Sequence, residues 1–108
     1  MAFLALASQK SLMMLQKNFL QFQYTSIMNQ TQAAAAQMTA IERSYAGSDD
    51  DYTEDASYIY YQDLSEQLET EKDSLDSQLT AIENEISGFK TLVQNNIKSS
   101  CTLNLINS

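Results

Sequence analysis

Apolar residues recur every seven positions along two long stretches of a chain that contains no proline. In the first stretch these positions are Leu6, Met13, Leu20, Ile27, Ala34 and Ile41. In the second they are Tyr61, Leu68, Leu75, Ile82 and Phe89, interleaved with Leu79, Ile86 and Val93. A seven-residue apolar repeat is typical of helices that pack against another helix along one stripe. Because no proline interrupts them, the pattern predicts helices over 3–45 and 56–100.

Between these helices lies one segment, 46–55, that combines Gly47 with a run of turn-favouring acidic residues. Two helices of similar length joined by a short loop fold back on each other as an antiparallel pair. We therefore predict an all-α fold, a long antiparallel two-helix hairpin of coiled-coil type, as a single domain over 1–108. An apolar tail is expected at 101–108.

The two helices differ in how their apolar residues are distributed around the helix axis. Those of the second helix fall within one narrow stripe, which a single partner helix covers. The residues predicted to form this seam inside the hairpin are Ile27, Ile41, Tyr61, Leu64, Leu68, Leu75, Leu79, Ile82, Ile86, Phe89 and Val93.

Near the two ends of the chain, apolar residues are instead spread around the whole helix. A hairpin partner covers only one side of such a helix, so other subunits are expected to cover the rest. We therefore predict assembly into a helical oligomer, a homo-polymer. Its predicted interface residues are Phe3, Leu4, Leu6, Leu12, Met13, Met14, Leu15, Phe19, Leu20, Phe22, Leu92, Leu103, Leu105 and Ile106.

The charge is strongly negative and concentrated in the middle of the chain. The net charge is −8, and all acidic residues lie between Glu42 and Glu85. This balance argues against nucleic acid and anionic membrane surfaces as partners. The loop and the start of the second helix are expected to form an exposed tip, made of Asp49, Asp50, Asp51, Tyr52, Glu54, Asp55 and Tyr58.

Sites for catalysis or metal binding are not expected. The chain has no histidine and only Cys101, which excludes the usual nucleophile–histidine pairs and an intrachain disulfide. Asp49, Asp51, Thr53 and Asp55 alternate as calcium ligands do. However, Glu54 and Tyr60 stand where a calcium-binding EF-hand loop needs glycine and a bidentate glutamate. We predict a protein that is not an enzyme and has no cofactor or metal.

Export without a cleaved signal is the expected route out of the cell. Lys10 follows the apolar residues Phe3, Leu4 and Leu6, whereas a cleaved signal peptide carries its positive charge before them. No stretch has the roughly 18 uninterrupted apolar residues of a membrane-spanning helix. The predicted location is extracellular, with a cytoplasmic location as the alternative.

Two known families share features of this organisation. The stretch from Phe3 to Gln30 is amphipathic and rich in Ser, Gln and Asn. In this it resembles the N-termini of bacterial axial proteins, the filament and needle subunits exported by flagellar and type III secretion machinery. The segment Tyr45-Ala46-Gly47 is similar to the Trp-x-Gly bend of the WXG100 family of small secreted hairpins. Tyr replaces the signature Trp, and the export signal expected after the second helix is missing.

The first resemblance implies a structural, self-assembling subunit of an extracellular bacterial filament or needle. In such a subunit the N- and C-terminal helices form the core and the acidic, tyrosine-rich loop faces outward. An export apparatus or chaperone would be a further partner. The alternative is a coiled-coil adaptor or chaperone, or a WXG100-like secreted hairpin, that binds a different helical protein.

Overall fold

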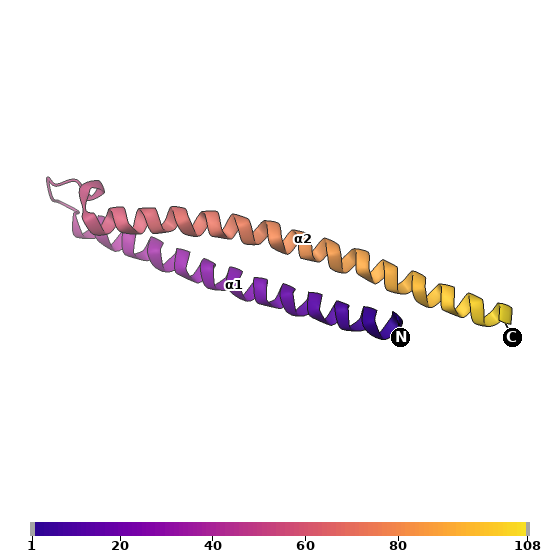
Figure 1. Cartoon of the computed structure of the whole chain (residues 1–108). Helices are drawn as coiled ribbons and strands as arrows, with labels where there is room; N and C mark the ends of the chain where they lie inside the picture. The colour runs from indigo at the N-terminus through magenta and orange to yellow at the C-terminus, as the bar shows by residue number, and fades with distance from the viewer. Residues whose placement is uncertain (1, 108) are drawn as a thin grey trace. The chain divides into compact units, whose positions relative to one another are not determined.

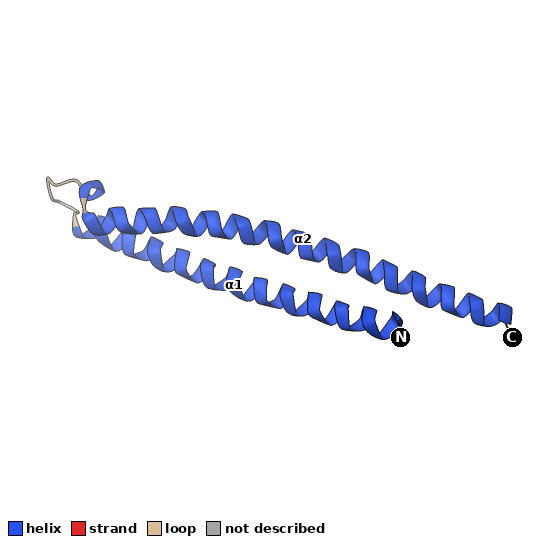
Figure 2. Cartoon of the chain, in the orientation of Figure 1, coloured by secondary structure: helices blue, strands red, loops and turns tan. Residues whose placement is uncertain are grey.

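Two long helices make up almost the whole molecule. The computed structural model describes residues 2–107, and it describes side chains for residues 7–95. The elements are α1 (Ala2–Ser44), the short 3-10 helix η1 (Tyr52–Glu54) and α2 (Ala56–Asn107) (Figure 1). Over the described residues there is no strand (Figure 2). The predicted all-α fold is confirmed, and α1 and α2 are in contact as a hairpin requires.

The helix boundaries agree with the prediction at three of four ends. Helix α1 ends at Ser44 and α2 begins at Ala56. Helix α2 continues to Asn107, so the predicted end at residue 100 is too early and the expected tail is helical. No proline or glycine follows Gly88, and the sequence therefore contains no residue that would break the helix earlier.

The chain forms two compact units, each built from both helices. Unit 1 comprises residues 1–21 and 77–108, and unit 2 comprises residues 22–76. Unit 1 therefore contains both ends of the chain, and unit 2 contains the loop. The organisation as a single domain stays a prediction.

A continuous row of covered side chains runs along α1 at alternating steps of three and four residues. In unit 1 the row consists of Lys10, Met13, Lys17 and Leu20, all half-buried. In unit 2 it consists of Tyr24, Ile27, Thr31, Ala34, Met38, Ile41 and Tyr45, among which Ile27 and Ala34 are buried. Alternating steps of three and four keep one face of a helix against its partner over many turns.

Helix α2 carries the matching row. In unit 2 it consists of Tyr58, Tyr61, Ser65, Leu68, Lys72 and Leu75, and in unit 1 of Leu79, Ile82, Ile86, Phe89 and Val93. Of these, Leu68, Leu75, Ile82, Ile86 and Phe89 are buried and the others half-buried. We call the two rows together the seam. Every predicted seam residue lies in it except Leu64, which is half-buried beside it.

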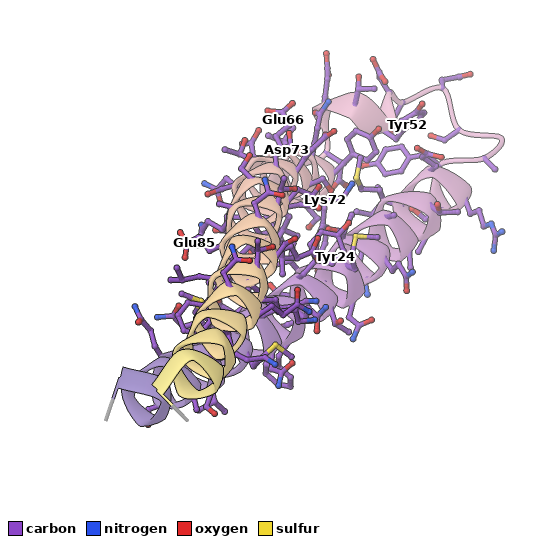
Figure 3. All side chains as sticks on the ribbon, turned by 90° about the vertical axis from the view of Figure 1, so that its right-hand side faces the viewer. Tyr24, Tyr52, Glu66, Lys72, Asp73 and Glu85 are labelled. Atoms are coloured by element: carbon purple, nitrogen blue, oxygen red, sulfur yellow. The ribbon has the colours of Figure 1, made fainter. Side chains whose placement is uncertain are left out.

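Polar side chains interrupt the seam and show how the helices are aligned. The Ser65 hydroxyl lies 3.8 Å from the Met38 sulfur, so these two residues face each other in unit 2. One heptad away on each helix, the same antiparallel alignment places Thr31 opposite Lys72. Figure 3 shows Lys72 on the side of α2 that faces α1, and Glu66 and Asp73 on its other side. Polar positions of this kind fix the register of a coiled coil at some cost in stability.

The seam is thin, because a pair of helices has no second layer. No described side chain is less than 2% exposed, and the most buried one is Ala34. A single stripe of this kind gives a small core for a chain of this length. Further burial is therefore available only on the outer faces of the helices.

Candidate assembly surface

The outer face of α1 in unit 1 is apolar and exposed. Leu12 is 60% exposed, Leu15 64% and Phe19 62%. We call these three residues the outer patch. At 100° per residue they lie roughly 150° around the helix from the seam row of the same unit. Helix α2 covers the seam side, so it leaves the outer patch in solvent.

The spacing of the outer patch matches that of the seam. Leu12, Leu15 and Phe19 follow one another at steps of three and four residues, and three residues further along α1, Phe22 of unit 2 is 74% exposed. Large apolar side chains at this spacing form the stripe that a second helix packs against. Isolated exposed apolar residues are ordinary on protein surfaces, whereas a row of them marks an interaction site.

Other exposed apolar residues lie outside this row. Met14 is 38% exposed and Leu92 is 51% exposed, both in unit 1. A shallow hollow beside the patch is lined by Ala7, Lys10, Ser11, Met14, Leu15 and Asn18. The apolar surface of unit 1 therefore extends beyond the row itself.

The predicted interface residues divide between these surfaces. Leu12, Met14, Leu15, Phe19, Phe22 and Leu92 are exposed, as an interface requires. Met13 and Leu20 are half-buried and lie on the seam row, because they share the heptad positions of Ile27 and Ala34. The structure therefore places these two residues on the seam and not on the outer face of α1. Phe3, Leu4, Leu6, Leu103, Leu105 and Ile106 lie outside the described side chains.

The loop holds its shape through Asp55. One carboxylate oxygen, Oδ2, accepts a 2.6 Å hydrogen bond from the Tyr45 hydroxyl. The other, Oδ1, accepts the backbone N–H groups of Ser57 (2.8 Å) and Tyr58 (3.2 Å). Asp55 therefore caps the N-terminus of α2 and also ties it to the end of α1.

These bonds shift the pKa values of both partners. The hydrogen bond from Tyr45, followed by those from Tyr58 and Ser57, lowers the pKa of Asp55 below its ordinary value. Donation to the Asp55 carboxylate raises the pKa of Tyr45 above 10.0. Burial, followed by the nearby Glu42 carboxylate, raises the pKa of Tyr58.

The tip is less exposed than predicted at three positions. Asp49, Asp50, Asp51 and Glu54 are exposed, whereas Tyr52, Asp55 and Tyr58 are half-buried. Asp55 is covered because it caps α2 and binds Tyr45. The rings of Tyr52 and Tyr58 pack edge to face with centroids 5.1 Å apart, and each covers part of the other. The structure therefore covers these three residues in part, whereas the sequence predicted that they would lie in an exposed tip.

Two features of these surfaces were not predicted from the sequence. The role of Tyr45 depends on a partner ten residues away across the loop, and helical periodicity contains no signal for such a contact. The outer row did have a signal, because Leu12, Phe19, Ser26, Ala33 and Ala40 recur every seven residues. That repeat was hidden among the many apolar residues around it.

Several other kinds of site are not found in the described part of the chain. No group of three or more acidic or cysteine side chains there is arranged to hold a metal ion. Neither helix, over its described residues, is long and apolar enough to cross a membrane. Comparison with protein-family models, curated proteins and solved structures gives no match.

Proposed function

We propose that the chain is a structural subunit that assembles with copies of itself into an extracellular filament or needle. One observation carries the proposal, the outer patch of Leu12, Leu15 and Phe19 on the face that α2 leaves uncovered. Its heptad spacing fits a helix, and each copy of the chain supplies helices with that same spacing. A second copy is therefore the simplest partner for the patch.

The size of the patch supports assembly through several contacts. Full burial of a Leu or Phe side chain contributes roughly 1.5–3 kcal/mol, so burying what is still exposed here contributes about 1–2 kcal/mol per residue. Three residues on each of two copies then contribute about 6–12 kcal/mol. This lies within the range of about 4–15 kcal/mol that association costs. Additional contacts, through Met14 and Leu92 for example, would raise the free energy gained by burial above the cost of association and so favour larger assemblies.

The filament role rests on the resemblance to bacterial axial proteins as well as on the patch. Unit 1 contains both ends of the chain and the outer patch, which supports placing it in a filament core. The loop of unit 2 carries the exposed acids Asp49, Asp50 and Asp51, which favours an outward position for the loop.

A second candidate is an adaptor in which a different helical protein covers the outer patch. The same observation supports it, because steps of three and four residues fit the helix of any partner. Such an adaptor needs no contact between its own copies, so it is expected to be a monomer when purified alone.

Negative-stain microscopy combined with size-exclusion chromatography of the purified protein separates the two candidates. The filament role predicts long polymers of uniform width. A stable monomer favours the adaptor and overturns self-assembly. A small dimer that grows no further overturns the filament role and leaves self-association standing.

A further inference from the structure

The outer row of α1 changes character between the two units. In unit 1 it consists of large apolar side chains, the outer patch. In unit 2, beyond Phe22, the row continues at the same steps of three and four residues, and its side chains there are small or short. These are Ser26, Asn29, Ala33, Ala36 and Ala40, all exposed except for the half-buried Ser26. A row of large side chains and a row of small ones are complementary in size.

Unit 2 is also hollowed along this row. A shallow depression on its surface is lined by Phe22, Thr25, Ser26, Asn29, Gln30 and Ala33. The lining is formed by α1 alone, so neither α2 nor the loop covers it. A large side chain from outside can enter this depression without displacing any other element.

The two units carry opposite net charge. Unit 1 contains four lysines and two glutamates, a net charge of +2. Unit 2 contains twelve acidic residues against Arg43 and Lys72, a net charge of −10. Two copies therefore repel when unit 2 lies beside unit 2, and they attract when unit 1 lies beside unit 2.

We propose that unit 1 of one copy packs antiparallel onto unit 2 of a second copy, through the outer rows of their α1 helices. Leu12 of one copy then lies over Ala40 of the other, and Phe19 lies over Ala33 with its ring in the depression. This inference rests on the proposed self-assembly and specifies the contact that produces it.

Both size and charge select this arrangement over a parallel one. A parallel pair in register would place Leu12 on Leu12 and Phe19 on Phe19, which also buries apolar surface. However, it would bring two copies of unit 2, each with a net charge of −10, side by side. It would also leave the row of small residues facing the same row of the other copy. The antiparallel pair places the large Leu12 and Phe19 on the small Ala40 and Ala33, and a positive unit on a negative one.

Each copy supplies both a unit 1 and a unit 2, so each copy can take either part in this contact. Met14 and Leu92 lie outside the row and stay exposed in such a pair. They are available for contacts between pairs, which a larger assembly requires.

Cysteine cross-linking tests the pairing directly in the full-length chain. In a Cys101→Ser background, one preparation carries Leu12→Cys and another carries Ala40→Cys. Each preparation, and then a mixture of the two, is treated with a short bifunctional thiol reagent and analysed on a denaturing gel. The proposal predicts at least a fivefold higher yield of cross-linked dimer in the mixture than in either preparation alone. Efficient cross-linking of Leu12→Cys to itself would show a parallel pair and overturn the proposal.

A second pair of positions guards against loss of association caused by Leu12→Cys itself. Ser8 and Ser44 are exposed, lie on the same side of α1 and pair in the same register. Ser8→Cys and Ser44→Cys are nearly isosteric and leave the outer patch intact, so the same mixture is again predicted to cross-link. Association of the Cys101→Ser protein without either mixed cross-link overturns this inference alone. If that protein does not associate at all in sedimentation, the proposed function fails as well.

Discussion

Phe19→Asp tests the outer surface of α1 without disturbing the seam between α1 and α2. The Phe19 side chain is 62% exposed and faces away from α2, so the hairpin should tolerate the change. Exposed substitutions of this kind shift the free energy of unfolding by about 0.5 kcal/mol or less. The helical signal in circular dichroism and the midpoint of thermal unfolding of the dilute protein are therefore expected to stay close to wild type.

Assembly, by contrast, should be lost. Without the ring, the contact loses the roughly 1–2 kcal/mol of association free energy that further burial of Phe19 would contribute. Placing an unpaired carboxylate in an apolar contact costs roughly 3 kcal/mol more. The total of about 4–5 kcal/mol corresponds to an association that is weaker by roughly three orders of magnitude per contact. Size-exclusion chromatography with light scattering should then show the variant as a monomer at concentrations where the wild-type protein associates.

Two control variants show whether position matters more than charge. Gln21→Asp adds the same charge to an exposed site of α1 outside the outer row, and it should associate nearly as the wild type does. Asp50→Asn combined with Asp51→Asn removes two charges from the tip, where exposed charges are screened and weakly coupled. This double variant should also assemble. Association of Phe19→Asp like wild type, or loss of assembly in the tip variant while Phe19→Asp keeps it, would show that the outer patch is not the contact surface.

Three further predictions concern the hairpin itself. Leu75→Asp places a charge at a seam position that is 7% exposed. It should destabilise the fold by about 3–5 kcal/mol, with loss of helical circular dichroism as the readout. Gly88 and Gly47 form a matched pair, because an added Cβ meets nothing within 4 Å at either site and only Gly47 has a positive φ, of 80°. Gly88→Ala should raise stability by about 0.5–1 kcal/mol, whereas Gly47→Ala should lower it in the same urea titration. Tyr45→Phe removes the hydrogen bond to Asp55 and should lower the unfolding midpoint most between about pH 5 and pH 9. The pKa of Asp55 is lowered in the folded protein, so its contribution to the free energy of unfolding is lost as the pH falls through that folded-state pKa. The pKa of Tyr45 is raised, so its contribution is lost as the pH rises through the folded-state pKa of Tyr45. A difference between Tyr45→Phe and wild type that does not change with pH would contradict this account.

The fold was largely predictable because it depends on periodicity. The heptad positions from Met13 to Ile41 and from Tyr61 to Phe89 lie on one face of a helix by simple geometry. Structure was needed only to show which residues share the seam with them, such as Lys72 and Tyr45. The end of α2 was missed because the break expected near residue 100 had no proline or glycine to produce it.

The candidate surface was only partly predictable. An apolar side chain at a given position looks the same in the sequence whether it faces the partner helix or solvent. Met13 and Leu12 are neighbours in the chain, and each belongs to a seven-residue repeat. The observed burial shows that the repeat of Met13 forms the seam and that Leu12 lies in the outer patch. The hydrogen bond between Tyr45 and Asp55 depends on the path of the loop, which periodicity does not determine.

The mass of the unmodified protein in solution tests the central claim most directly. Sedimentation velocity of the full-length chain over a dilution series reports whether the outer face of α1 binds other copies. We predict a 12.1 kDa monomer at high dilution and, as the concentration rises, multiples of that mass. A single 12.1 kDa species at every concentration would contradict the account.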